Sequence, residues 1–187
     1  MTKENTLSCE RNSVPERTIP RACEPSLVYP FPGLDPAASY PTTAAFEVAN
    51  TRDSRGSGIR ALNNFSRGEM LARITGVLVT RRQLHTLQLN PRLHLYDPHF
   101  AGMLLHSCEP NAFLDMNELG LWCLKDISPG TLVTVDYAAT EDVLSRQFAC
   151  RCGANTCRAW ITGRKERAII DRERWANADA DSIAAAL

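Results

Sequence analysis

Four cysteines of the chain have the spacing of a metal site. Three of them follow the pattern C-x-C-x4-C, at Cys150, Cys152 and Cys157. A closed tetrahedral zinc site takes four ligands, so a fourth thiolate has to come from elsewhere. Cys108, within the H-S-C-E-P-N motif of residues 106–111, is the predicted partner. The pattern therefore predicts one structural Zn²⁺ ion per chain that joins two segments distant in the sequence.

The remaining three cysteines are not expected to bind metal. A count of seven, with short C-x-C spacing and no secretion signal, fits reduced thiols better than disulfides. Cys123 lies in the apolar run 121–124 and is expected to be a small core residue. Cys9 and Cys23 lie fourteen positions apart in a proline-rich segment, so a second metal site there is the less favoured alternative.

Five motifs follow one another in a fixed order. They are R-G-S-G-I-R at 55–60, F-S-R-G-E-M-L at 65–71, the 106–111 motif, I-S-P-G-T-L-V-T-V-D-Y at 127–137, and the three-cysteine loop at 148–157. Over about Phe46 to Gly163 they resemble the SET-domain family, mostly protein lysine methyltransferases that use S-adenosylmethionine, with that family's post-SET zinc loop. A single G-x-G is a weak signal, but five motifs in one order are hard to explain by chance.

The resemblance implies roles for individual residues. The cofactor S-adenosylmethionine would be held by Arg55, Gly56, Ser57, Gly58, Leu105 and His106. At His106 the contact would come from main-chain groups. Tyr137 matches the tyrosine whose hydroxyl orients the acceptor amine near the methyl group. Methyl transfer to an amine is an in-line displacement that depends mainly on positioning, so Asp136 is expected to be structural.

The zinc loop would have an architectural function. With Cys108 it would pin the C-terminal loop over the cofactor pocket, and Trp160 or Phe148 would help to wall the active site. Ser107, Pro110 and Asn111 are expected to shape the pseudoknot-like crossing of this family rather than to take part in chemistry.

The chain departs from the family pattern in three ways. Leu105 stands where an asparagine usually hydrogen-bonds the cofactor, and such a bond to a charged ligand is worth about 1.5–3 kcal/mol. Val135 replaces a common aromatic residue, which leaves room for a more methylated amine or another acceptor. The pair Thr131-Leu132 replaces two acidic residues and is interpreted as a surface change.

Composition restricts the partners. The 21 basic and 21 acidic residues balance, so no direct binding to nucleic acid or to an anionic membrane is expected. The chain has no apolar run long enough to span a bilayer, and residues 1–10 are too polar for a secretory signal. We therefore expect an intracellular protein, cytoplasmic or nuclear.

The predicted fold is mainly β with short helices, a SET fold of small antiparallel sheets. The expected divisions are a proline-rich extension at 1–43, the SET domain at 44–140 with a short variable insert at about 80–100, the post-SET zinc loop at 141–163 and a C-terminal helix at 164–187. The apolar patch 27–31 is expected to lie against the body and to make the extension partly ordered, with a mobile tail as the alternative. Leucines interrupted by Pro91 predict one short helix and then irregular chain over 80–95. So short an insert implies an open substrate cleft.

The C-terminal helix and three of the histidines are not expected to take part in chemistry. A period near 3.6 places Trp175 and Ile183 on one helical face, which is expected to pack on its own domain, with a dimer contact or a lid as alternatives. His85, His94 and His99 lack ligand-like spacing and are expected at the surface or in loops.

Three functions remain in competition. The leading hypothesis is methylation of a lysine side chain of a protein. The second is a SET-fold enzyme adapted to a small molecule, suggested by the short insert, Leu105 and Val135. The third is a binding module without turnover, which Leu105 favours and Tyr137 and the glycine turn oppose. Binding of S-adenosylmethionine and of its demethylated product would best separate them.

Overall fold

The computed structural model describes residues 26–51 and 55–169 of the 187-residue chain. Short strands dominate this part of the molecule. They are β1 (Phe46–Asn50), β2 (Ser57–Ala61), β3 (Met70–Arg73), β4 (Val77–Val79), β5 (Thr86–Asn90), β6 (Leu93–Tyr96), β7 (Leu105–His106), β8 (Ala112–Asp115), β9 (Gly120–Cys123), β10 (Thr134–Val135), β11 (Phe148–Ala149) and β12 (Trp160–Ile161). The helices are the 3₁₀ turns η1 (Pro36–Ala38) and η2 (Ala101–Met103) and the single-turn α1 (Tyr137–Thr140).

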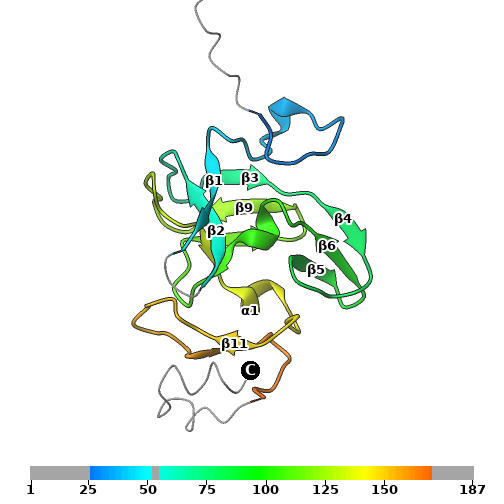
Figure 1. Cartoon of the computed structure of the whole chain (residues 1–187), viewed down its shortest axis with the longest axis vertical. Coiled ribbons are helices and arrows are strands. Elements are labelled where there is room, and N and C mark those ends of the chain that lie inside the picture. The colour runs from blue at the N-terminus through cyan, green and yellow to red at the C-terminus, as the bar shows by residue number, and fades with distance from the viewer. Residues whose placement is uncertain (1–25, 52–54, 170–187) are drawn as a thin grey trace, which may run out of the picture.

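The strands form small sheets, as the sequence analysis predicted. The antiparallel sheets have the orders β1-β2, β3-β9-β8, β4-β6-β5 and β11-β12. Figure 1 shows β1, β2, β3 and β9 in the upper body, the β4-β6-β5 sheet to one side, and β11 below α1. The mainly β fold with few helices is therefore confirmed.

A parallel pair, β7 with β10, lies at the centre of the functional region. Leu105 pairs with Thr134 and His106 with Val135. The side chain of Asn111 supports this crossing, because its Oδ1 accepts the N–H of Thr134 at 2.8 Å while its Nδ2 donates to a carbonyl of the same segment. Two segments that are distant in the sequence are thus held side by side, with Asn111 in the structural role expected of it.

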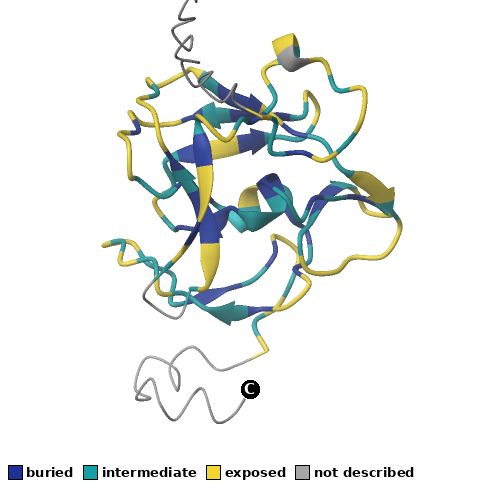
Figure 2. Cartoon of the chain, turned by 45° about the horizontal axis from the view of Figure 1, so that its top comes forward, coloured by how far each residue is buried: buried dark blue, intermediate teal, exposed yellow. Residues whose placement is uncertain are grey.

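The core fills the space between the sheets. Phe100, Ile59, Leu104, Leu121 and Ile127 are almost completely buried, and Figure 2 shows buried residues along the strands and in η2. Cys123 is buried among them with 2% of its surface exposed, as a small core residue should be. Burying such side chains supplies the main driving force for this fold.

The apolar patch at residues 27–31 lies against the body, as expected. Tyr29 has only 3% of its surface exposed, and its hydroxyl donates to Asp97 Oδ2 at 2.8 Å. Asp97 also accepts the N–H groups of Phe100 and Ala101, so it holds the start of η2. The carboxylate therefore links the N-terminal patch to the segment that leads into β7.

The predicted helix within 80–95 is wrong. This segment forms β5 and β6, an antiparallel hairpin that pairs with β4. Asn90 Oδ1 accepts the N–H of Arg92 and closes the turn. Leu87 and Leu95, paired across the hairpin, enter the core, so their packing overrides the leucine spacing that suggested a helix.

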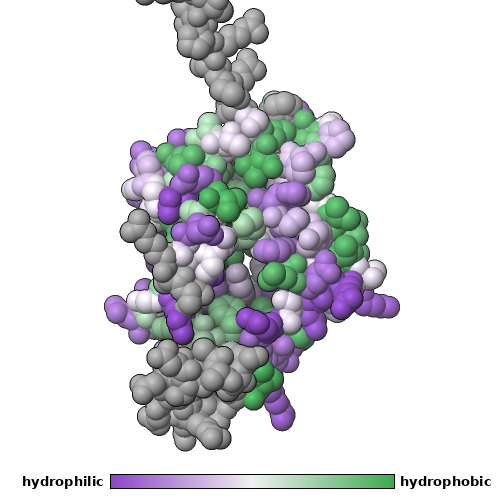
Figure 3. Space-filling model, in the orientation of Figure 1, coloured by the Kyte–Doolittle hydropathy of each residue, from purple (hydrophilic) through white to green (hydrophobic). Residues whose placement is uncertain are grey.

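The expected location of His94 is also wrong. It lies on β6 with 3% of its surface exposed, instead of at the surface or in a loop. Its pKa is lowered by burial and by the charge of Arg82. His85 and His99 occupy loops as expected. At one edge of the same sheet, β4 exposes Val77 and Leu78. Figure 3 shows an apolar area on the side of the molecule where this sheet lies.

The described chain ends before the predicted C-terminal helix can be traced. Residues 164–169 form a turn and irregular chain, so no helix begins at Arg164, and the rest of the predicted helix, with its dimer contact, lies outside the described residues. Cys9 and Cys23 lie outside them too. Within the ranges 26–51 and 55–169, no helix has the length and apolar character needed to cross a membrane.

Candidate functional site

The four cysteines predicted to bind metal come together. The Sγ atoms of Cys108, Cys150, Cys152 and Cys157 all lie within 4.8 Å of one another. The sulfurs of Cys108 and Cys150 are 3.8 Å apart, which is about the edge of a tetrahedron with Zn–S bonds of about 2.3 Å. The donor set and its size therefore fit one tetrahedral zinc ion.

Local contacts hold these thiols in place. Cys150 N–H donates to the carbonyl of Ala159 at 2.7 Å, next to the pairing of β11 with β12. Glu109 accepts the backbone N–H and the hydroxyl of Thr156, which ties the 106–111 motif to the cysteine loop and lowers the pKa of Glu109. The N–H of Arg158 donates to Cys108 Sγ at 3.3 Å. Such donors favour thiolate ligands.

Tyr137 begins α1 directly after the β7–β10 pair. Its hydroxyl donates to the carbonyl of Leu104 at 2.7 Å. Its ring contacts those of His106 and Phe148, with centroids 5.3 and 5.8 Å away. Burial, followed by the charge of Glu141, raises the pKa of Tyr137 to about 12. The phenol is therefore neutral near pH 7.

His106 has a side-chain contact that the sequence did not reveal. Its Nδ1 accepts the backbone N–H of Tyr137 at 3.3 Å, and its Nε2 lies 3.4 Å from Cys108 Sγ. Burial lowers the pKa of His106 to about 4, although Asp136 opposes that shift. A neutral ring that accepts at Nδ1 carries its proton on Nε2, facing the sulfur. One imidazole thus touches both the tyrosine and the cysteine cluster.

Asp136 is a structural residue, as the sequence suggested. Its side chain accepts the N–H of Ala138 at 3.1 Å and caps α1. It also pairs with the guanidinium of Arg158. Because Arg158 follows Cys157 directly, this ion pair connects the cysteine cluster to the turn that carries Tyr137.

The two chain segments expected to hold the cofactor meet at Gly58. A Cβ built at Gly58 would come within 2.7 Å of the Leu105 side chain and 3.6 Å of Leu132. Gly56 takes a positive φ of 86° in the turn before β2, and the side chain of Ser57 donates to that of Asn50. Arg55 is the first described residue after the gap at 52–54. The glycine turn and the 105–106 segment are therefore neighbours in space.

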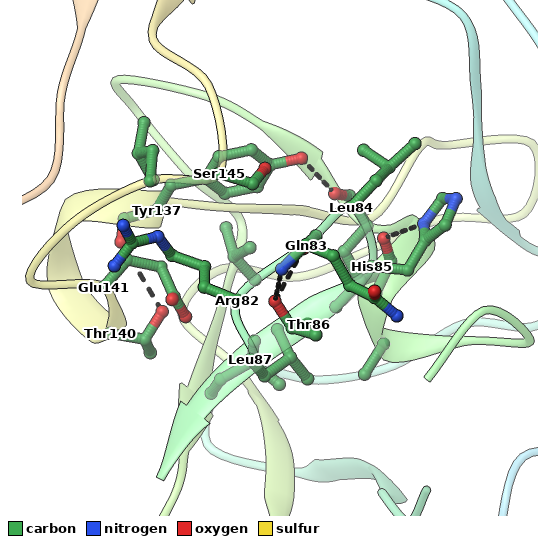
Figure 4. Close-up of a pocket in the computed structure, with 16 residues that line it drawn as sticks. Arg82, Gln83, Leu84, His85, Thr86, Leu87, Tyr137, Thr140, Glu141 and Ser145 are labelled. Atoms are coloured by element: carbon green, nitrogen blue, oxygen red, sulfur yellow. Dashed lines mark hydrogen bonds between the residues drawn. The ribbon is translucent and has the colours of Figure 1, made fainter. Parts of the chain in front are cut away.

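A pocket opens next to Tyr137 and encloses about 550 Å³, its open mouth included. Insert residues 82–87 form one side, and Thr140 and Glu141 form part of the other. Figure 4 shows Tyr137 between these sides, with its hydroxyl bonded to a carbonyl at the pocket wall. Val135, the residue that departs from the family's aromatic position, also lines the pocket. Sequence reasoning missed Arg82, Thr140 and Glu141, because nothing in their spacing marks them.

Known proteins identify the fold around this pocket. A family model described as SET domain matches residues 56–138, a range that includes the glycine turn and Tyr137. Residues 56–138 of this chain are similar to the SET domain.

The structure also shows where the two aromatic residues expected in the active-site wall lie. Phe148 lies beside Tyr137, while Trp160 is buried and donates from its indole to Gln147. Of the two aromatic residues proposed for the site wall, Phe148 is the one next to the tyrosine.

Several curated proteins are similar in sequence to this chain. The probable histone-lysine N-methyltransferase lin-59 of Caenorhabditis elegans is 29% identical over 57% of this chain and 9% of its own length. The H3 lysine-9 specific histone-lysine N-methyltransferase dim-5 of Neurospora crassa is 25% identical over 64% of this chain and 51% of its own. The match therefore spans about a tenth and about half of these two relatives.

A third relative and two solved structures extend the comparison. Methyltransferase flvH of Aspergillus flavus is 27% identical over 63% of this chain and 68% of its own length. KRYPTONITE, crystallised with mCHG DNA and SAH, is 26% identical with a TM-score of 0.50 over 62% of this chain and 29% of that one. The methyltransferase domain of human SETMAR also has a TM-score of 0.50, at 21% identity over 63% of this chain and 58% of that one. These neighbours bear out the SET fold.

Proposed function

We propose that this protein is an S-adenosylmethionine-dependent N-methyltransferase that acts on a lysine side chain of a protein. One observation carries the proposal. At the β7–β10 pair, Leu105 contacts Gly58, while Leu104 and Val135 line the pocket together with Tyr137. Donor and acceptor could thus approach one another from two directions at the same crossing, which an in-line displacement requires.

Arg55, Gly56, Ser57 and Gly58, with the main chain at Leu105 and His106, are the residues that would hold the cofactor. A side chain at position 58 would clash with Leu105, so glycine lets the 55–58 turn and the 105–106 segment lie close together. Leu105 offers an apolar surface there in place of an amide. When bound, S-adenosylmethionine supplies an electrophilic methyl group on sulfur.

Tyr137 would orient the acceptor amine. Its hydroxyl proton is engaged by the carbonyl of Leu104, and its raised pKa keeps it protonated. The oxygen therefore has a lone pair left to accept an N–H of the incoming amine. That bond would direct the nitrogen lone pair away from the tyrosine, while the buried Leu104 and Val135 exclude water.

Zinc at the four cysteines would act through placement. The ion would fix the loop that carries Phe148 against Tyr137 and His106. Arg158 adds a second connection through Asp136 at the cap of α1. The metal would therefore stabilise the wall of the acceptor site without touching the reacting atoms.

A small-molecule amine is a second candidate acceptor. Methyltransferase flvH, which is matched over 68% of its own length, is named only as a methyltransferase. The insert hairpin that borders the pocket is short, since β5 and β6 span residues 86–96. A lysine side chain and a small-molecule amine would react in the same way at nitrogen. They differ in the rest of the molecule that the pocket would have to accommodate.

Purified protein and labelled S-adenosylmethionine test the proposal. Calorimetry should detect binding of S-adenosylmethionine and of S-adenosylhomocysteine, and the label should move to a lysine-containing protein or peptide. Transfer only to free amines would support the small-molecule candidate. Absence of binding by either cofactor form would reject the methyltransferase and leave the binding-module interpretation.

A further inference from the structure

Glu141 is a buried acid in the wall of the pocket that opens on Tyr137. Only 6% of its surface is exposed, and it lines the pocket directly after α1. Its Oε1 accepts the backbone N–H of Gln88 at 2.9 Å, and the hydroxyl of Thr140 is a second neutral partner. None of the ion pairs found among residues 26–51 and 55–169 includes Glu141.

The neighbouring acid has the opposite surroundings. Asp142 pairs with Arg164 at 2.9 Å and with Lys165 at 3.0 Å. Hydrogen bonds from Gln88 and Lys165 lower the pKa of Asp142 to about 2, whereas burial raises the pKa of Glu141. A buried carboxylate without a cation is unfavourable. Arg164 and Lys165 form their ion pairs with Asp142, whereas Arg164 and Arg82 act on Glu141 only as more distant charges that lower its pKa less than burial raises it.

We propose that Glu141 binds a second positive charge of the substrate, next to the amine that accepts the methyl group. The inference rests on the proposed function, because it takes the acceptor amine to lie at Tyr137. The second charge could belong to an arginine or lysine beside the target lysine in a protein, or to the other amine of a small diamine. Both sources present a cation that would complete the partners of the carboxylate.

Arg82 offers a control variant whose effect on cation binding should be opposite to that of a variant at Glu141. It is exposed on the insert, lines the same pocket and extends across it toward Tyr137 and Glu141 in Figure 4. Its positive charge would repel a substrate cation and would attract a carboxylate. His85 also lines the pocket, but its Nδ1 is bonded to the carbonyl of Gly102 at 2.7 Å. Variants at 82 and 141 should therefore change cation binding in opposite directions.

Matched probes can measure this preference by calorimetry on the full chain with S-adenosylhomocysteine present. The first pair is a seven-residue peptide with a central lysine and one arginine neighbour, and the same peptide with uncharged citrulline in place of the arginine. The second pair is 1,5-diaminopentane and 1-aminopentane. We expect the charged member of one pair to bind about tenfold more tightly, and the pair that shows the preference identifies the source of the cation.

Glu141→Gln is the central variant, because glutamine keeps an acceptor for the Gln88 N–H while it removes the charge. The tenfold preference should disappear in Glu141→Gln and should increase in Arg82→Gln. An equal preference in wild type and Glu141→Gln would overturn the proposal, and so would weaker binding of the charged probe to Arg82→Gln. Probe binding is measured without turnover. A protein that keeps the preference but never transfers a methyl group would reject the proposed function and leave the role of Glu141 standing.

Discussion

Leu105 occupies the space that a side chain at position 58 would need. A Cβ at Gly58 would lie 2.7 Å from Leu105 Cγ and Cδ1, and Leu105 itself is 8% exposed. An asparagine at 105 would exchange this apolar packing for a buried amide. This packing is what a cofactor pocket rebuilt around leucine would require, and it motivates the next experiment.

Leu105→Asn should therefore destabilise the protein and fail to tighten S-adenosylmethionine binding. A buried amide without partners costs about 1–3 kcal/mol. Chemical denaturation and calorimetry of the same sample measure both quantities. If binding tightened by about tenfold with full stability, the rebuilt-pocket interpretation would be wrong.

Gly58→Ala should destabilise the fold by about 1–3 kcal/mol, because the added methyl group overpacks the contact with Leu105. Leu105→Ala opens the same space, so the double variant should lose less than the sum of the two single losses. Denaturant unfolding of all four proteins gives the coupling energy. Strict additivity would mean that the two residues do not share this contact.

Tyr137→Phe should lower turnover by about a hundredfold, while the Kd for S-adenosylmethionine stays close to that of wild type. The hydroxyl is expected to act on the acceptor and not on the donor. Tyr96→Phe, on β6 and away from the pocket lining, is the matched control. Equal losses of turnover and cofactor binding would indicate misfolding, and unchanged turnover would remove Tyr137 from the mechanism.

Metal analysis should find about one zinc ion per chain. Cys108→Ser should lower that content as strongly as Cys152→Ser, because a closed site needs all four thiolates. Cys123→Ser, at a buried cysteine outside the cluster, should keep the metal. Limited proteolysis should then cut the 148–163 loop of the metal-free variants first. Full zinc content in Cys108→Ser would rule out the four-ligand site.

Glu141→Gln should gain stability relative to wild type as the pH rises from 4 to 7. The pKa of Glu141 is raised in the folded state, so its favourable contribution is complete below the ordinary value near 4.5 and is lost as the folded group ionises. Glutamine has no such loss. Thermal unfolding at several pH values measures the difference in Tm, and a difference independent of pH would contradict the buried, unpaired carboxylate.

The order of motifs was sufficient to predict the SET fold. Cysteine spacing predicted which thiols would meet, since a C-x-C-x4-C loop lacks one ligand and Cys108 lies in the other recognised motif. Tyr137 could be proposed as a site residue because it ends the 127–137 motif, the fourth of the five ordered motifs. These features can be recognised in the sequence because each depends on particular residue types at a fixed local spacing.

Tertiary contacts decided the rest. Residues 86–96 became a hairpin because their leucines pack against strands far away in the chain, a relation that local periodicity does not contain. The bond from Tyr137 N–H to His106 exists only because β10 lies beside β7. Glu141 and Asp142 are adjacent in sequence, yet one is paired with cations and the other faces a pocket. Burial and the positions of neighbouring charges set that difference, and both arise only when the chain is folded.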